Sequence, residues 1–164
     1  MQSSMLEFKP INLQQHQDLC VQFRADSFVC SFGSATRFYE EDGNGAERYL
    51  QWLRQRIAEI PNSCVHAWKG EQIIGQVEMT RWKHDPSIGY INLFYLIPEF
   101  RGQGLGRQLN RYAASFLKQL GCRAARLSVS PTNLAAIRFY FKQGYINLGQ
   151  KEDAFEVYYF EKIT

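Results

Sequence analysis

The chain has 164 residues and a net charge of +3, and its hydrophobic content of 45% excludes an intrinsically disordered segment. No apolar run approaches the roughly 20 residues that a membrane-spanning helix needs. The N-terminus lacks the basic and apolar regions of a signal peptide, so we predict one cytoplasmic domain, residues 1–164, that does not bind a membrane.

The first third of the chain predicts one strand and two helices. Residues 6–11 alternate weakly between apolar and polar side chains and contain a proline, which is typical of an edge strand. Asn12 can cap a helix that ends at about Asp26. Residues 27–45 contain clusters of glycine, serine and acidic side chains and predict a loop. Residues 46–60 carry apolar side chains at helical spacing and predict the second helix.

The middle of the chain predicts a meander of antiparallel strands. Residues 64–69 and 72–82 are two strand-like runs that a Gly-Glu hairpin turn separates. A turn at residues 84–87 leads into residues 91–97, which are apolar, rich in aromatic side chains and typical of a buried strand. Pro98 ends this strand, because proline has no N–H to donate to a ladder.

Three glycines after this strand predict a tight turn into a helix. Gly102, Gly104 and Gly106 permit backbone conformations that are costly for residues with a Cβ. A continuous apolar stripe then runs from Leu105 to Leu120 and predicts an amphipathic helix. A strand, a glycine-rich turn and a helix N-terminus together direct free N–H groups at one point. We therefore expect a phosphate-bearing ligand there.

The last third predicts a parallel strand, a helix and two closing strands. Residues 126–130 follow a helix and should pair parallel with the buried strand. Either Thr132 or Asn133 can cap a helix over residues 134–143. The closing strands are predicted at residues 145–148 and 155–161, with a polar turn at residues 151–153. The pattern predicts an α+β fold, a mixed and mostly antiparallel sheet of about seven strands with about four helices.

Basic side chains are concentrated between Phe100 and Gln150, where the chain has no Asp or Glu. They are Arg101, Arg107, Arg111, Lys118, Arg123, Arg126, Arg138 and Lys142. This pattern suits a polyanionic ligand, and a solvated basic surface is an equally good interpretation. A nucleic-acid-binding module is a further alternative, but the segment has no dense run of Lys and Arg, so we predict no nucleic acid partner.

The four cysteines form no C-x-x-C pair and lie near no cluster of histidines. They are Cys20, Cys30, Cys64 and Cys122. This spacing is not typical of a zinc site or a disulfide framework. We predict four reduced, mostly buried thiols and no metal.

The glycine turn does not match the two commonest nucleotide-binding motifs. Its spacing is G-x-G-x-G, whereas a dinucleotide-binding Rossmann unit has G-x-G-x-x-G after a first strand. No Gly-Lys-Ser/Thr of a P-loop is present. A pyrophosphate site without magnesium ligands is the interpretation that remains.

Three motifs together resemble the GNAT superfamily of N-acetyltransferases. Residues 101–106 fit the signature Q/R-x-x-G-x-G/A, and residues 133–145 fit N-x-x-A-x-x-x-Y-x-x-x-G-F/Y. Residues 94–101 resemble the strand that precedes the first signature. The resemblance covers residues 91–145, whereas the first third of the chain matches only in the order of its elements.

The resemblance implies acetyl-CoA as the co-substrate and a sheet that splays at its central strand. Backbone groups of residues 95–97 would then pair with pantetheine, and the N–H groups of residues 103–107 would hold the pyrophosphate. The residues assigned to acetyl-CoA are Tyr95, Leu96, Ile97, Arg101, Gly102, Gln103, Gly104, Leu105, Gly106, Arg107, Asn133, Ala136 and Tyr140. Arg138 can add a further contact to a phosphate.

The second motif implies roles for Asn133 and Tyr140, which lie on one side of a helix. Asn133 would bond to pantetheine. Tyr140 would be the catalytic acid, since a phenol with a pKa of about 10 can protonate a thiolate whose conjugate acid has a pKa of about 8.5. The alternatives are that Asn133 is only a helix cap and Tyr140 only a core aromatic.

The general base is less well defined. An alkylammonium acceptor with a pKa of about 10.4 must lose a proton before it attacks the thioester. Glu78 is the tentative base, acting through water, although a solvated strand residue is the alternative. An acidic residue at position 92 would have been a better candidate for the base, but the chain has Asn92 there. His66 and His84 are further candidates, because histidines titrate in a suitable pH range.

The acceptor is predicted to bind along residues 23–49. Acidic side chains there, interleaved with aromatic ones, can attract a cationic amine, or they form a plain acidic surface loop. The acids are Asp26, Glu40, Glu41 and Asp42. The resemblance thus implies transfer of an acetyl group to a primary amine of a small molecule, a peptide or a protein. A non-catalytic acyl-CoA sensor is the alternative, and a homodimer is compatible with either.

Overall fold

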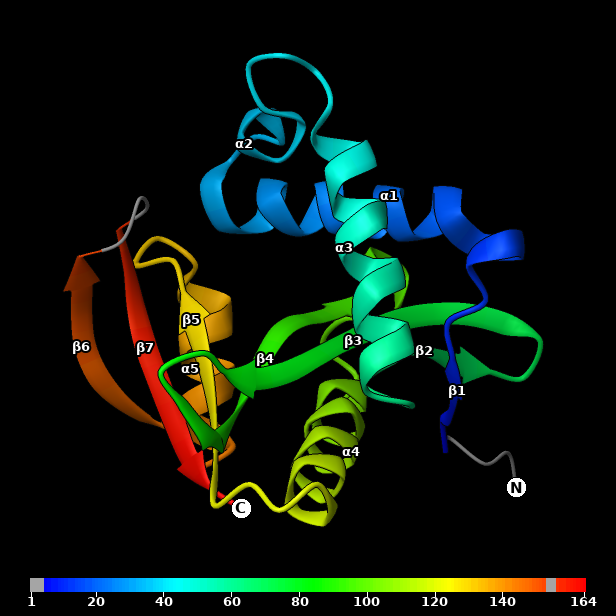
Figure 1. Ribbon diagram of the computed structural model, residues 1–164. Coiled ribbons are helices and arrows are strands. Elements are labelled where there is room, and N and C mark those ends of the chain that lie inside the picture. Colours follow the sequence, from blue (N-terminus) through cyan, green and yellow to red (C-terminus); the bar gives the residue numbers. More distant parts are fainter. Residues whose placement is uncertain (1–4, 153–155) are drawn as a thin grey trace.

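The computed structural model describes residues 5–152 and 156–164, and Figure 1 shows its arrangement. One sheet of seven strands has the order β1-β2-β3-β4-β5-β7-β6. The strands are β1 (Glu7–Pro10), β2 (Cys64–Lys69), β3 (Gln72–Trp82), β4 (Asp85–Leu96), β5 (Ala124–Val129), β6 (Ile146–Glu152) and β7 (Glu156–Ile163). Only the β4–β5 pair is parallel among the described strands, and the α+β fold with a mixed sheet is therefore confirmed.

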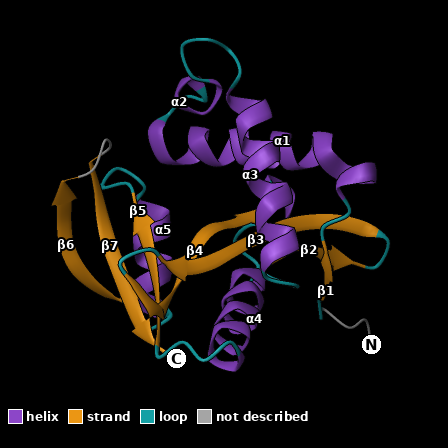
Figure 2. Cartoon of the chain, in the orientation of Figure 1, coloured by secondary structure: helices purple, strands orange, loops and turns teal. Residues whose placement is uncertain are grey.

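Helices cover both faces of the sheet (Figures 1 and 2). They are α1 (Leu13–Phe32), α2 (Thr36–Tyr39), α3 (Gly45–Glu59), α4 (Leu105–Gln119) and α5 (Leu134–Lys142), with a 3₁₀ turn at Pro98–Phe100. Leu109 and Leu117 of α4 lie in the main core with strand residues such as Val77. Leu53 of α3 lies with Cys20 of α1 in a second core. The apolar stripes predicted for these helices are thus buried.

Helix α1 is longer than predicted, and this is the largest correction to the first third. The helix begins after Asn12, whose side chain accepts from the Gln15 N–H, but it ends at Phe32 and not at Asp26. Gly33 ends it with a φ of 81°, and its N–H donates to the Val29 carbonyl at 2.8 Å. Much of the predicted loop at residues 27–45 is therefore helical. The short α2 also brings the number of α-helices in the described residues to five.

The other predicted elements differ from the structure mainly at their ends. Strands β2 and β3 have their predicted bounds, but β4 begins at Asp85, so the turn before it is shorter than predicted. Strand β6 extends to Glu152, well beyond residue 148. The predicted turn at Asp153 and the predicted start of the last strand at Phe155 lie outside the described residues.

The sheet splays at its central strand, as predicted. Strand β4 pairs with β5 only as far as Ile91 and Leu127. On the other side, Glu78 pairs with Leu93 and Met79 with Ile91, so Asn92 is an extra residue in β4, a bulge. Beyond Ile91 the two strands separate, and Figure 1 shows β5, β7 and β6 as a group that stands apart from β1–β4. Within the described part of the chain, no helix has the length and apolar character needed to cross a bilayer.

Candidate active site

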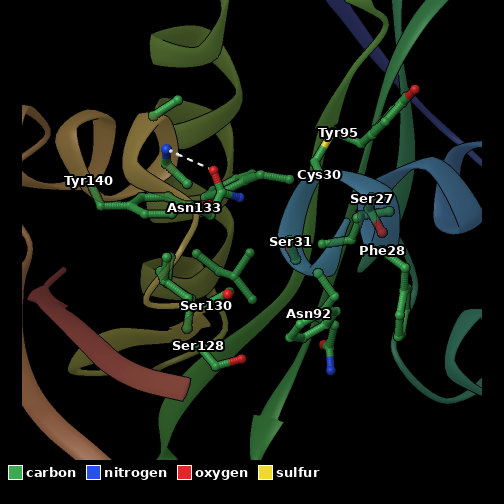
Figure 3. A pocket seen from close by; sticks show the side chains of 18 of the residues that line it. Ser27, Phe28, Cys30, Ser31, Asn92, Tyr95, Ser128, Ser130, Asn133 and Tyr140 are labelled. Carbon is green, nitrogen blue, oxygen red and sulfur yellow. Dashed lines mark hydrogen bonds between the residues drawn. The ribbon is translucent and has the colours of Figure 1, made fainter. Parts of the chain in front are cut away.

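A cavity of about 450 Å³ lies where β4 and β5 separate. Helix α1 supplies one wall through residues such as Ser27 and Phe28, and α5 supplies the opposite wall through Asn133 and Tyr140 (Figure 3). Strand β4 runs between these walls. The resemblance predicted the β4 and α5 sides of this cavity, and the α1 side belongs to residues 23–49, which were predicted to bind the acceptor.

The predicted residues of β4 lie at the cavity, but the Tyr95 side chain does not point into a free space. Its hydroxyl donates to Asp26 Oδ2 at 2.5 Å, and burial raises its pKa above the ordinary value. Arg101 donates from Nη2 to the same Asp26 oxygen at 3.0 Å and from Nε to the Leu96 carbonyl at 2.8 Å. The Ile97 N–H donates to Ile74 on β3 at 2.8 Å. The Arg101 guanidinium thus already binds protein groups.

The glycine turn leads directly into α4. Gly102 and Gly104 have φ values of 75° and 81°, and Gly104 caps the helix without a side-chain hydrogen bond. The first N–H groups of α4 therefore remain for a ligand. Gly106 lies inside α4 and not in the predicted turn. A Cβ at this position would lie 3.0 Å from the Phe139 ring, so Gly106 allows α4 and α5 to pack closely.

The other predicted phosphate contacts lie away from the cavity wall. Arg107 lines a separate shallow hollow on the surface of α4 together with Arg111 and Lys118. Arg138 is exposed, and its Nε lies 3.5 Å from the Leu134 carbonyl of its own helix. Gln103 donates to the Glu99 carbonyl at 2.9 Å, which braces the glycine turn.

Helix α5 places the two residues of the second motif in the cavity, with Ala136 beside them. Asn133 caps the helix through its oxygen, which accepts from the Ala136 N–H at 3.3 Å, so its amide nitrogen is kept for a further contact. The Tyr140 ring stacks on Phe94 at 6.1 Å and meets Tyr145 at 5.4 Å. Burial raises the pKa of Tyr140, and its hydroxyl is therefore protonated at neutral pH.

Glu78 is buried beneath the cavity and is not one of the lining residues. Its Oε2 accepts from the Tyr49 hydroxyl at 2.5 Å and from Gln76 Nε2 at 2.7 Å. Its Oε1 faces Arg24, whose Nη1 lies 3.4 Å away and which does line the cavity. The role of Glu78 as a base stays a prediction, and any path from it to the cavity passes Arg24.

Neither predicted histidine lines the cavity within the described residues. His66 of β2 is buried beside Cys20 of α1 and shares a hydrogen bond of 2.8 Å with Gln76 Oε1. Burial lowers its pKa to about 4, so it is neutral near pH 7. His84 lies on the turn before β4, with its ring 5.4 Å from that of Trp82.

The α1 wall lies within residues 23–49, which were predicted to bind the acceptor, but the sequence prediction missed that this wall is helical. Arg24, Ser27, Phe28 and Ser31 recur at helical spacing and line the cavity together. This spacing, with Gly33 as the stop, is the signal that could have revealed the longer helix. Cys30 also lines the cavity and is exposed, in contrast to the other three cysteines, which are buried.

The acidic residues predicted to attract the acceptor are largely paired with arginines. Asp26 binds Arg101, as described above. Glu40 lies 3.1 Å from Arg48, and Asp42 also forms an ion pair with Arg48 on the exposed segment before α3. Glu40 and Asp42 share the single charge of Arg48, so residues 40–42 keep part of the predicted negative charge.

Comparisons with known proteins agree with this arrangement. The family model described as the acetyltransferase (GNAT) family matches residues 26–145. An uncharacterized N-acetyltransferase of Archaeoglobus fulgidus is 38% identical over 132 residues, which are 72% of this chain and 84% of that protein.

Solved structures show the same fold. The PaiA N-acetyltransferase of Thermoplasma acidophilum, in complex with coenzyme A, has a TM-score of 0.72 at 17% identity and covers 98% of this chain and 99% of its own. The Salmonella typhimurium protein yncA, solved with acetyl-CoA, has a TM-score of 0.73 at 13% identity over 98% of this chain and 94% of its own. Because the family model spans the splayed strand, the glycine turn and the motif of α5, the chain belongs to the GNAT family of acetyltransferases.

Proposed function

We propose that this acetyltransferase moves the acetyl group of acetyl-CoA to a primary amine of a small molecule, a peptide or a protein. The observation that carries the proposal is the cavity at the splay, with a free strand edge, a helix N-terminus without a side-chain cap and a half-buried tyrosine around it. Each of these three features has a counterpart in the chemistry of acetyl-CoA.

The co-substrate would extend from the start of α4 into the cavity and towards α5. Backbone groups near Leu96 would pair with pantetheine as a neighbouring strand does. The N–H groups at the start of α4, around residues 103–107, would hold the pyrophosphate, because they lack intrahelical partners and the helix dipole favours an anion. The Asn133 amide nitrogen would donate to a pantetheine carbonyl. Arg101 would act mainly by bracing Leu96, since its guanidinium is already bound there.

Tyr140 would protonate the departing thiolate. The acceptor nitrogen attacks the thioester carbon, the new C–N bond forms, the C–S bond breaks, and the thiolate takes the phenolic proton. The attacking amine must give up a proton in the same step, and Glu78 acting through water is the proposed receiver. The walls of the cavity would supply much of the acceleration by holding the amine near the thioester.

The acceptor would enter beside α1. The C-terminal third of α1 provides serine hydroxyls and the Phe28 ring on the side opposite Tyr140 (Figure 3). These groups suit an amine that carries both apolar and hydrogen-bonding parts. Asp26 is less suited to hold a cationic acceptor, since it already binds Tyr95 and Arg101.

A thiol-release assay tests the proposed function. Purified protein and acetyl-CoA are mixed with polyamines, aminoglycosides, amino acids and peptides, and free CoA is followed over time. We expect at least one class of amine to accelerate thiol release well above the rate of acetyl-CoA hydrolysis. Binding of CoA without acceleration by any amine would favour the acyl-CoA sensor instead.

A matched pair of glycine variants tests the pyrophosphate site. Gly104 and Gly121 flank α4, have φ values of 81° and 93°, and leave open space where a Cβ would stand. Gly104→Ala and Gly121→Ala should therefore cost similar stability, about 1–2 kcal/mol each. Only Gly104→Ala should weaken CoA binding, by about fivefold, because it disturbs the free N–H groups of α4. Calorimetric titration with CoA and thermal unfolding measure the two effects, and equal affinities would contradict this location.

A further inference from the structure

The splay leaves backbone groups of β4 without a neighbouring strand. The Ile97 N–H donates to β3, and because backbone groups alternate along a strand, those of Leu96 and Phe94 point to the opposite edge. This edge faces the cavity, since β5 has already turned away after Ile91. Phe94 and Leu96 are themselves among the lining residues.

Two arginines from distant parts of the chain occupy carbonyls of this segment. Arg24 Nη1 donates to the Asn92 carbonyl at 2.9 Å, across 68 positions of sequence. Arg101 Nε donates to the Leu96 carbonyl at 2.8 Å. Asn92 is the bulge residue, where the ladder to β3 is interrupted and a carbonyl is most in need of another donor. The backbone of Phe94 lies between the two occupied carbonyls.

The buried side chain of Glu78 holds Arg24 in place. Its side chain is fully buried, and its Oε2 is saturated by Tyr49 and Gln76. Its Oε1 has no hydrogen-bond partner, and the Arg24 guanidinium 3.4 Å away is the cation that it faces. A buried carboxylate oxygen of this kind strongly favours a nearby positive charge. The Arg24 side chain is 20% exposed and therefore connects the buried carboxylate to the cavity.

Aromatic rings limit the movement of Arg24 further. Its guanidinium lies 5.8 Å from the Phe28 ring and 5.7 Å from the Tyr49 ring. The Asn92 side chain is fixed as well, since its Oδ1 accepts from Thr80 at 3.1 Å. The bulge is thus held from α1 and from β3, and not by the ladder alone.

We propose that Arg24, held by Glu78, is a positioning residue that fixes the bulge at Asn92 and so sets the register in which acetyl-CoA lies along β4. Arg24 and Arg101 occupy the Asn92 and Leu96 carbonyls, so the backbone of Phe94 between them stays free. A ligand that pairs like a strand can then bind in only one register. The thioester carbon is then placed relative to Tyr140 by the same contacts. This inference rests on the proposed binding of acetyl-CoA at this edge.

The test compares two pairs of substitutions. Arg24→Met with Glu78→Gln removes both charges, so that no unpaired ion is left buried. The control is Arg126→Met with Glu161→Gln, a half-buried ion pair of 2.6 Å between β5 and β7, whose residues do not line the cavity. We expect the first double variant to bind CoA about tenfold more weakly than the wild type and the control variant to bind it equally well. Thermal unfolding verifies that both are folded.

Hydrogen exchange separates positioning from general stability. In the first double variant, the peptide that covers residues 91–97 should exchange faster while the rest of the sheet keeps its protection. Wild-type affinity in that variant, or an equal loss in the control, would overturn the inference. A wild-type protein that does not bind CoA would instead refute the proposed function.

Glu78→Gln alone provides a second variant, which keeps the size and the hydrogen bonds of the buried side chain. A positioning role predicts a higher KM for acetyl-CoA, by about threefold. The separate role of Glu78 as a base, proposed above, predicts a large loss of kcat and a shifted pH profile. An unchanged KM would refute the positioning role of Glu78, whatever happens to kcat.

Discussion

Replacement of Tyr140 by phenylalanine should lower kcat by about 100-fold and leave the affinity for CoA nearly unchanged. The ring remains, and with it the packing on Phe94, Tyr145 and Phe160. What is lost is the proton donor, whose pKa burial raises, so that it is fully protonated at the pH of the assay. Initial rates at saturating acetyl-CoA, together with a CoA titration, measure both quantities.

Tyr145→Phe is the matched control for this experiment. Tyr145 lies next to Tyr140, but its hydroxyl donates to Asn110 Oδ1 at 2.7 Å, and it does not line the cavity. Its loss should destabilise the fold by about 1–2 kcal/mol and leave kcat as it was. If Tyr140→Phe turns over as fast as the wild type while Tyr145→Phe behaves as expected, Tyr140 is a packing residue and not an acid.

Stability should fall by about 2 kcal/mol between pH 7 and pH 5 because of His66. Burial and, to a smaller extent, the nearby His16 lower the pKa of this imidazole from 6.5 to about 4. At a pH between about 4 and 6.5, His66 binds a proton in the unfolded chain but not in the folded protein. The contribution is therefore complete above pH 6.5 and is lost progressively as the pH falls towards 4.

His66→Gln isolates this effect, since its amide nitrogen can still donate to Gln76 but does not titrate. Urea unfolding of the wild type and the variant at several pH values gives the difference between their free energies of unfolding. The two stability curves should converge as the pH falls from 7 to 5. Parallel curves over this range would show that His66 is as easily protonated in the folded state as in the unfolded one.

The sequence predicted the β4 and α5 walls of the cavity better than the α1 wall, and there is a physical reason for the difference. Gly104, Asn133 and Tyr140 act within a few residues of their own position, through a turn, a helix cap and a helix face. Local spacing is therefore enough to reveal them. The parallel pairing of β4 and β5 could also be predicted from the sequence, because two neighbouring strands that a helix connects usually pair parallel.

The helical conformation of the α1 wall was harder to predict from the local sequence. The helix continues through Phe28 and Val29, whose aromatic and β-branched side chains have modest helix propensity, so intrinsic propensity alone does not extend the helix beyond Asp26. The hydrogen bond from Arg24 to Asn92 joins two residues 68 positions apart, and no local sequence pattern predicts it. The burial of Glu78 likewise depends on α3, which brings Tyr49 over the sheet.

The long α1 has a consequence for the order of folding. Thr132 Oγ1 donates to the Ser31 carbonyl across 101 positions, and Asp26 meets Arg101 across 75. The cavity is complete only once early and late parts of the chain have met, and such non-local contacts form slowly. Acetyl-CoA bound there would join both halves, so it should act as a cross-link that slows unfolding and raises the melting temperature in proportion to the logarithm of its concentration.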